Sequence, residues 1–131
     1  MFTGIFVNVP VSDVAKSRTF FEEVGFKVLE KYTGPKSVCL KLNENIQVML
    51  PEKSQFELML GKPAADRSSS EVLISLSCDS AETVKKITEK AISLGARKVN
   101  DFEENEFMYS WNFEDLDGHV WDLFWMNPEN M

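Results

Sequence analysis

The sequence predicts an α+β fold of two tandem βαβββ modules, which form curved mixed sheets around a concave pocket. Three observations support it. VPVSDVAKS, ahead of the first expected helix, parallels LSCDSAETV ahead of the second. GFKV after the first helix parallels GARKV after the second. A polar stretch separates the two halves. An internal repeat constrains the fold strongly, because each half is then one structural unit.

The first module covers residues 4–50. Residues 5–11 alternate in hydrophobicity, as a strand requires. Ser12 or Asp13 can cap a helix that runs to Val24, and Gly25 suits the left-handed position that ends it. Three further strands are expected, at residues 26–30, 37–42 and 46–50.

Residues 51–70 are expected to form a linker. The stretch is polar, contains Gly61-Lys62-Pro63 and ends in three serines. Residues 56–60 have the apolar content for one helical turn that packs on another part of the chain.

The second module covers residues 71–127 and repeats the first. A strand is expected at 71–78, and Asp79 or Ser80 then caps a helix that ends before Gly95. A strand at 97–100 and an acidic loop at 101–106 lead to a hairpin.

The hairpin, residues 107–126, holds all three tryptophans and the one histidine of the chain. Residues 115–118, Asp-Leu-Asp-Gly, favour a tight turn, because Asp bonds to nearby backbone and Gly accepts positive φ. Both faces of the outgoing strand are largely apolar, so both are expected to be covered. Asp122 lies in the middle of that strand and is therefore a candidate site residue.

Composition limits the possible partners. The 131 residues suffice for one domain, residues 1–131, with a hydrophobic core. The net charge of −7 argues against a nucleic-acid partner. We see no signal peptide and no apolar run of membrane length, and expect a cytoplasmic protein without a membrane partner. Cys39 and Cys78 lie in apolar stretches and are expected to be buried thiols.

Two motifs, FVNVPVSDVAKSRTFFEEVGF and FEDLDGHVWDLFWM, carry a resemblance to a known family. With the preceding FMY, the chain resembles the vicinal oxygen chelate superfamily, which includes glyoxalase I, extradiol dioxygenases and bleomycin-resistance proteins. It is most similar to the branch labelled predicted lactoylglutathione lyase. The resemblance covers nearly the whole chain and implies the double βαβββ fold, while one fold hosts many reactions.

The resemblance also implies a divalent metal, with one ligand from the first and last strand of each module. Those positions hold Phe6, Leu73 and Asp122, with Gln47 or Met49 as the fourth. Phe6 and Leu73 cannot bind a metal, and a catalytic site needs about three protein ligands. We therefore expect no metal and no other cofactor.

Asp122 has two interpretations that the residues leave open. It is a general base or a carboxylate for a cationic ligand, or it is bonded to Gln47, Ser75 or Tyr109. His119 is expected to pack at the start of the hairpin, with acid–base chemistry as its alternative. Residues 107, 109, 111 and 113 form an aromatic row that faces a helix or a dimer partner, and some of its members could stack on a ligand. The expected pocket residues are Phe6, Asn8, Gln47, Met49, Leu73, Ser75, Tyr109, Trp111 and Asp122.

The function expected from these features is metal-independent binding of an unknown small molecule, in the manner of bleomycin-resistance proteins. The alternative is a glyoxalase-like metal-dependent lyase, with Asp122 as base or as sole carboxylate ligand. A dimeric domain that modulates another protein is a third option. We expect a homodimer, because superfamily members usually pair modules across chains and three tryptophans on one hairpin exceed the needs of a small core.

Overall fold

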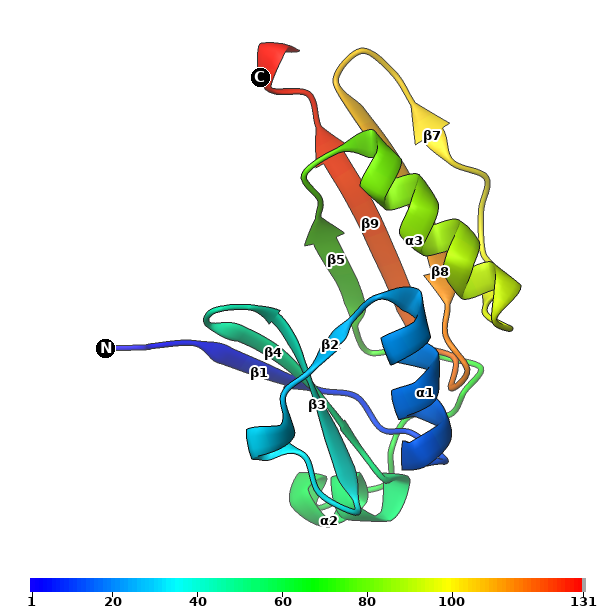
Figure 1. The fold of residues 1–131 in the computed structure, drawn as a ribbon. Coiled ribbons are helices and arrows are strands. Elements are labelled where there is room, and N and C mark those ends of the chain that lie inside the picture. Colours follow the sequence, from blue (N-terminus) through cyan, green and yellow to red (C-terminus); the bar gives the residue numbers. More distant parts are fainter. Residues whose placement is uncertain (131) are drawn as a thin grey trace. The chain divides into compact units, whose positions relative to one another are not determined.

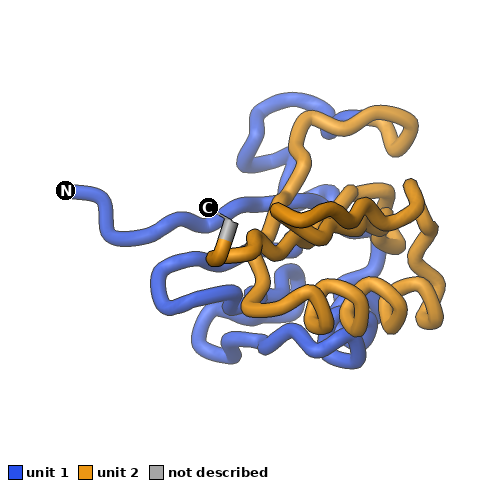
Figure 2. Tube along the Cα trace, turned by 90° about the horizontal axis from the view of Figure 1, so that it is seen from above, with its two compact units in different colours: residues 1–65 blue, residues 66–131 orange. Residues whose placement is uncertain are grey.

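A boundary between residues 65 and 66 divides the chain into two structural units (Figure 2). The computed structural model describes residues 1–130, and the units are Met1–Ala65 and Asp66–Met131. The boundary lies inside the predicted linker 51–70. Each unit contains one mixed sheet, which confirms the α+β class and the repeated βαβββ pattern.

The N-terminal unit has a four-stranded sheet in the order β1-β4-β3-β2. β1 runs parallel to β4, and the other neighbours are antiparallel. Figure 1 shows α1 beside this sheet. The elements are β1 (Ile5–Asn8), α1 (Val14–Val24), β2 (Lys27–Val28), the 3-10 helix η1 (Glu30–Tyr32), β3 (Ser37–Asn43), β4 (Ile46–Pro51) and α2 (Lys53–Leu60).

Helix α1 begins and ends where the sequence predicts. The Asp13 carboxylate accepts a hydrogen bond from the Lys16 N–H at 3.0 Å, which satisfies one of the free amides at the helix start. Gly25 ends the helix with φ of 119°. The helix contributes apolar side chains to a core that it shares with β3 and β4. Its buried members include Phe20, Phe21, Val24, Val38, Leu40, Val48 and Leu50.

The C-terminal unit repeats this order, with the sheet β5-β9-β8-β6 and β7 also paired to β8. β5 runs parallel to β9, as β1 does to β4. In Figure 1, α3 lies along β8 and β9. The elements are β5 (Leu73–Ser77), α3 (Ala81–Ser93), β6 (Arg97–Lys98), β7 (Glu103–Glu104), β8 (Met108–Glu114), β9 (Val120–Met126) and the 3-10 helix η2 (Pro128–Asn130).

The core of this unit lies between α3 and one face of the sheet. Ser80 caps α3, since its hydroxyl accepts a hydrogen bond from the Thr83 N–H at 3.1 Å. The sheet contributes large side chains with almost no exposed surface. The buried residues include Ile74, Val84, Ala91, Phe113, Trp121 and Leu123.

Several predicted boundaries differ from those observed. β1 ends at Asn8 rather than at Val11, although the N–H groups of Val9 and Val11 still bond to β4 carbonyls. Pro10 lies between these two bonded residues, where its missing N–H would face away from β4. In the linker, α2 is an eight-residue helix, longer than the single turn expected at 56–60.

The other differences concern the second strand of each module and the acidic loop of the C-terminal module. The predicted strands 26–30 and 97–100 reduce to two residues each, β2 and β6. The loop 101–106 contains β7, which pairs with β8. No helix within residues 1–130 combines the length and hydropathy that a membrane span requires.

Candidate functional site

Asp122 lies at the centre of a polar row that crosses the C-terminal sheet. Its register partners are Ser75 on β5 and Asn112 on β8. The Ser75 hydroxyl donates a hydrogen bond to Asp122 Oδ2 at 3.2 Å. Ser75 is thus the one of the three candidate partners that the structure places against this carboxylate. Asp122 is half-buried and Ser75 is exposed, so the row remains open to solvent.

Asn112 adds a second acceptor beside Asp122. Its Oδ1 atom is buried and has no hydrogen-bond partner within the described residues. A buried acceptor without a partner costs about 1–3 kcal/mol. Because the atom has almost no exposed surface, a donor would reach it only if the Asn112 side chain moved.

The Asp122 row lies on the sheet face opposite α3. Side chains alternate along a strand, so Trp121 and Leu123 enter the α3 core while Asp122 points the other way. Val120 and Phe124 flank Asp122 on the same face and are half-buried. Leu73, on β5, is 59% exposed there. This face is therefore a mixed polar and apolar surface, which we call the Asp122 face.

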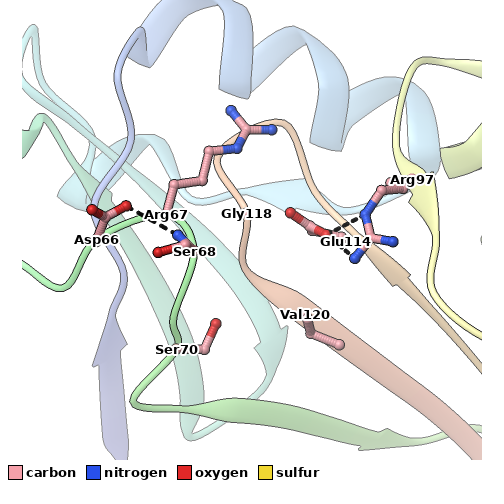
Figure 3. Close-up of a pocket in the computed structure, with 8 residues that line it drawn as sticks. All are labelled: Asp66, Arg67, Ser68, Ser70, Arg97, Glu114, Gly118 and Val120. Atoms are coloured by element: carbon pink, nitrogen blue, oxygen red, sulfur yellow. Dashed lines mark hydrogen bonds and ion pairs between the residues drawn. The ribbon is translucent and has the colours of Figure 1, made fainter.

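A pocket of about 580 Å³ lies at one end of the Asp122 face, near the turn of the β8–β9 hairpin (Figure 3). Residues 66–70 form one wall, and β6, β8 and the start of β9 form the other. We call it the hairpin pocket. Its lining residues are Asp66, Arg67, Ser68, Ser70, Arg97, Glu114, Gly118 and Val120.

Ion pairing organises one side of the hairpin pocket. Arg97 approaches Glu114 Oε2 through Nε and Nη2, each at 2.5 Å. The Glu114 side chain is only 14% exposed, and the positive charge of Arg97 compensates its negative charge in place of water. Two N–H groups on one carboxylate fix the orientation of both side chains.

The N-terminal unit contains the other predicted pocket residues. Phe6 pairs in register with Gln47, and Asn8 pairs with Met49, so all four share one face of that sheet. Gln47 is buried and donates a hydrogen bond to the Glu44 carbonyl at 3.5 Å. Phe6 is 47% exposed and meets Tyr32 edge to face at 5.7 Å. The last contact adds an aromatic surface at the sheet edge.

The register identifies the counterpart of Asp122 in the N-terminal unit. Asn8 and Ser75 each lie five residues before the residue that caps the next helix, Asp13 and Ser80. Their partners on the last strand are Met49 and Asp122. Of the two alternatives, Gln47 and Met49, the structure therefore favours Met49.

Tyr109 and Trp111 require a correction, because they do not share a face with Asp122. They alternate with Ser110 and Asn112 along β8 and lie on the α3 side. Tyr109 is buried and stacks with Phe102 at 5.3 Å, and burial raises the pKa of its phenol. The Trp111 indole donates a hydrogen bond to the Asn100 carbonyl at 2.8 Å.

The two cysteines and the histidine contribute little to the Asp122 row. Burial raises the pKa of both the Cys39 and the Cys78 thiol, which lowers the thiolate fraction needed for nucleophilic attack. His119 is half-buried at the start of β9, and its backbone N–H donates a hydrogen bond to Asp115.

Comparison with known proteins places the chain in a family. A family model described as the glyoxalase/bleomycin resistance protein/dioxygenase superfamily matches residues 5–123. The chain belongs to this superfamily. A search of curated proteins finds no match.

Several solved structures share the fold of this chain. A hypothetical protein from S. aureus is 27% identical, with a TM-score of 0.80 over 95% of this chain and 94% of that chain. A glyoxalase/bleomycin resistance protein/dioxygenase family enzyme from Burkholderia phytofirmans is 20% identical, with a TM-score of 0.77 over 93% and 97%. A glyoxalase-related enzyme from Fulvimarina pelagi is 15% identical, with a TM-score of 0.80 over 98% and 90%.

The residues at the metal positions of the superfamily do not suit a metal ion. Phe6, Met49 and Leu73 have no oxygen or nitrogen in their side chains, which leaves Asp122 as the one charged donor. Within residues 1–130, no three His, Cys, Asp or Glu side chains form a group that could hold a metal. Asp122 instead accepts its hydrogen bond from Ser75.

Sequence reasoning missed the hairpin pocket. Arg67 lies in the predicted linker, and Arg97 and Glu114 belong to different strands that meet only in the folded sheet. Nothing in the spacing of these residues indicates that they meet. The one available signal is Gly118 in the turn, because a glycine can mark a place where another part of the chain lies close to the backbone.

Proposed function

We propose that this superfamily member binds a small organic molecule on the Asp122 face and does so without a metal. The observation that carries the proposal is the hydrogen bond between Ser75 and Asp122, together with the apolar side chains of Phe6, Met49 and Leu73 at the other metal positions. A lone carboxylate held by a hydroxyl is an acceptor for a ligand N–H or O–H group. One carboxylate is not enough for a catalytic metal site, which needs about three protein ligands.

The chemistry of the Asp122 face defines the ligand it would suit. Asp122 provides an acceptor at the centre, while Val120, Phe124 and Leu73 provide apolar surface around it. Ligand sites commonly combine apolar walls with a few polar groups that orient the ligand. The ligand expected here has a hydrogen-bond donor attached to an apolar body.

A metal-dependent lyase of the lactoylglutathione type is the second candidate. Its support is membership of the superfamily together with the Asp122 carboxylate, which would serve as base or as sole charged ligand. The two candidates differ in what the purified protein retains and in what it catalyses.

Elemental analysis after dialysis separates the two candidates. We expect less than stoichiometric nickel, zinc, manganese and iron, and no activity on the glutathione–methylglyoxal adduct when these ions are added. Stoichiometric retained metal or metal-dependent turnover would favour the lyase and contradict metal-free binding.

Native mass spectrometry of the same preparation tests the binding site. We expect a co-purified small molecule that is lost in Asp122→Asn and weakened in Ser75→Ala. Glu82→Gln, an exposed carboxylate change on α3, is the matched control and should retain the molecule. Equal retention in Asp122→Asn and wild type would remove Asp122 from the site.

A further inference from the structure

The hairpin pocket contains a guanidinium that takes part in no ion pair within the described part of the chain. Arg67 reaches over the hairpin turn from the segment 66–70, as Figure 3 shows. We propose that the hairpin pocket binds an anionic oxygen group, a carboxylate or a phosphate, through Arg67. The proposal deepens the proposed function, since it identifies the charge that one end of the ligand would carry.

The local backbone holds Arg67 in place. The carboxylate of Asp66 accepts a hydrogen bond from the Ser68 N–H at 3.1 Å, and the Asp66 carbonyl accepts one from the Ser69 N–H at 2.9 Å. These two bonds close a turn with Arg67 at its second position. The arginine is therefore presented by an ordered turn.

Gly118 provides the space through which Arg67 passes. A Cβ atom at Gly118 would lie 2.7 Å from Arg67 Cγ and 3.3 Å from the Arg67 carbonyl oxygen. A side chain at this position would therefore have to displace Arg67. The stem of Arg67 therefore lies over the backbone of Gly118, and its guanidinium is presented at the turn of the hairpin.

The charges around the pocket leave Arg67 available. Arg97 and Glu114 neutralise each other through the two contacts at 2.5 Å. The Asp66 carboxylate is directed at the Ser68 N–H. The remaining polar groups, the Arg67 guanidinium and the hydroxyls of Ser68 and Ser70, can all donate hydrogen bonds. A planar guanidinium pairs with two oxygens of a carboxylate or phosphate at once, and the ligand that fits is an anion.

The pocket also has the size and position to hold one end of a larger ligand. Its volume of about 580 Å³ falls in the range of small-molecule sites. Val120 lines it, and Asp122 is two residues farther along the same strand face, roughly 7 Å away at the rise of a strand. A molecule with an anionic group at Arg67 and a hydrogen-bond donor at Asp122 would span the two.

Titration with inorganic phosphate and, separately, acetate tests the site in the full-length protein. Amide resonances in ¹⁵N-labelled protein report the location, with sodium chloride at matched ionic strength as the blank. We expect saturable shifts at Gly118, Ser68 and Val120. Arg67→Gln is expected to weaken binding about tenfold or more, and Arg67→Lys less, because lysine keeps the charge but loses the planar pair of donors. The anion that binds more tightly identifies the ligand chemistry.

Lys85→Gln removes one charge from an exposed position of α3 and is the matched control, expected to bind as wild type does. Equal binding by wild type and Arg67→Gln, or no saturable shift at Gly118 with either anion, would overturn the proposal. Asp122→Asn distinguishes the two proposals, because phosphate should still bind to it. If this variant loses the organic ligand but keeps phosphate, both proposals hold. If the organic ligand binds through Asp122 but phosphate does not bind at Arg67, the proposal for the hairpin pocket is wrong and the proposal for the Asp122 face is kept.

Discussion

Trp121 donates its indole N–H to the Oδ2 of Asp115 at 2.9 Å, with both side chains buried. The other oxygen, Oδ1, accepts the backbone N–H groups of Asp117 and His119 at 2.9 and 3.0 Å. One carboxylate therefore joins the turn of the hairpin to the side chain at the centre of the core. The shape of the turn and the packing of Trp121 depend on each other.

Asp115→Ala is expected to lower the free energy of unfolding by about 3 kcal/mol or more. The change leaves three N–H groups without their acceptor, and each buried donor without a partner costs about 1–3 kcal/mol. Urea unfolding followed by tryptophan fluorescence measures the loss. Glu103→Ala, an exposed carboxylate on β7, is the control and should change stability by less than about 0.5 kcal/mol. A similar small effect of Asp115→Ala would contradict the role given to this carboxylate.

Stability should also depend on pH through Asp115. Burial raises the pKa of this carboxyl in the folded protein, while the charge of His119 and the bond from Trp121 lower it in part. The unfolded pKa is about 3.9. The folded state therefore binds more protons, and the stability contributed by this group is complete below that pH and lost as pH rises through the folded pKa.

The Asp115→Asn variant cannot ionise at this position and so serves as the reference. The unfolding free energy of wild type minus that of the variant should fall as pH rises from about 4. Urea midpoints across that range measure it. A difference that stays constant or grows with pH would show that the folded carboxyl does not have a raised pKa.

Gly118→Ala is expected to destabilise the hairpin by about 1–3 kcal/mol, since it combines backbone strain with a steric clash. Gly118 has φ of 89°, and its Cβ would meet Arg67 Cγ at 2.7 Å. Thermal unfolding measures the change. Gly25→Ala is a matched control for strain, because Gly25 has φ of 119° with no atom within 4 Å of the Cβ position.

A double-mutant cycle isolates the contact between Gly118 and Arg67. Arg67→Ala removes the Cγ atom, so Gly118→Ala should cost less in that background than in wild type. Equal costs in the two backgrounds would mean that Arg67 does not lie over the turn. Gly34→Ala, with open space around the Cβ position, should have almost no effect.

We also expect the protein to form a homodimer. Exposed apolar side chains in both units, such as Phe6, Leu58 and Leu73, offer surface that a partner copy could cover. Sedimentation velocity at micromolar concentration should give a mass near twice the chain mass of 15.0 kDa. A single species at the monomer mass would refute the dimer.

The secondary structure was largely readable in the sequence because its signals are local. Asp13 and Gly25 mark the ends of α1 by their own capping chemistry. The turn at residues 115–118 follows from Asp and Gly at neighbouring positions. The short β2 and β6 were overestimated, because the length of a strand is set by the neighbour with which it pairs and not by its own sequence.

The candidate site could be predicted only in part, because its residues are brought together by contacts that are distant in sequence. The family repeat located Asp122, but the face of β8 that accompanies it depends on the register of β8 with β9. A shift of one residue moves every side chain to the other face, and Tyr109 and Trp111 were placed with the wrong set. Arg67 and Glu114 line the same pocket through tertiary packing alone.

The parallel pairing of β5 with β9, like that of β1 with β4, has a mechanical consequence. In each sheet the first and last strands of the module are neighbours that run in the same direction. A force that pulls the two ends of a module apart therefore loads all the bonds between these strands together, in shear. The five register pairs of β5 and β9 would have to break nearly at once. Each module should therefore resist a force applied between its two ends. A force that separates the two strands of the hairpin would break their bonds one pair at a time and should open the module far more easily.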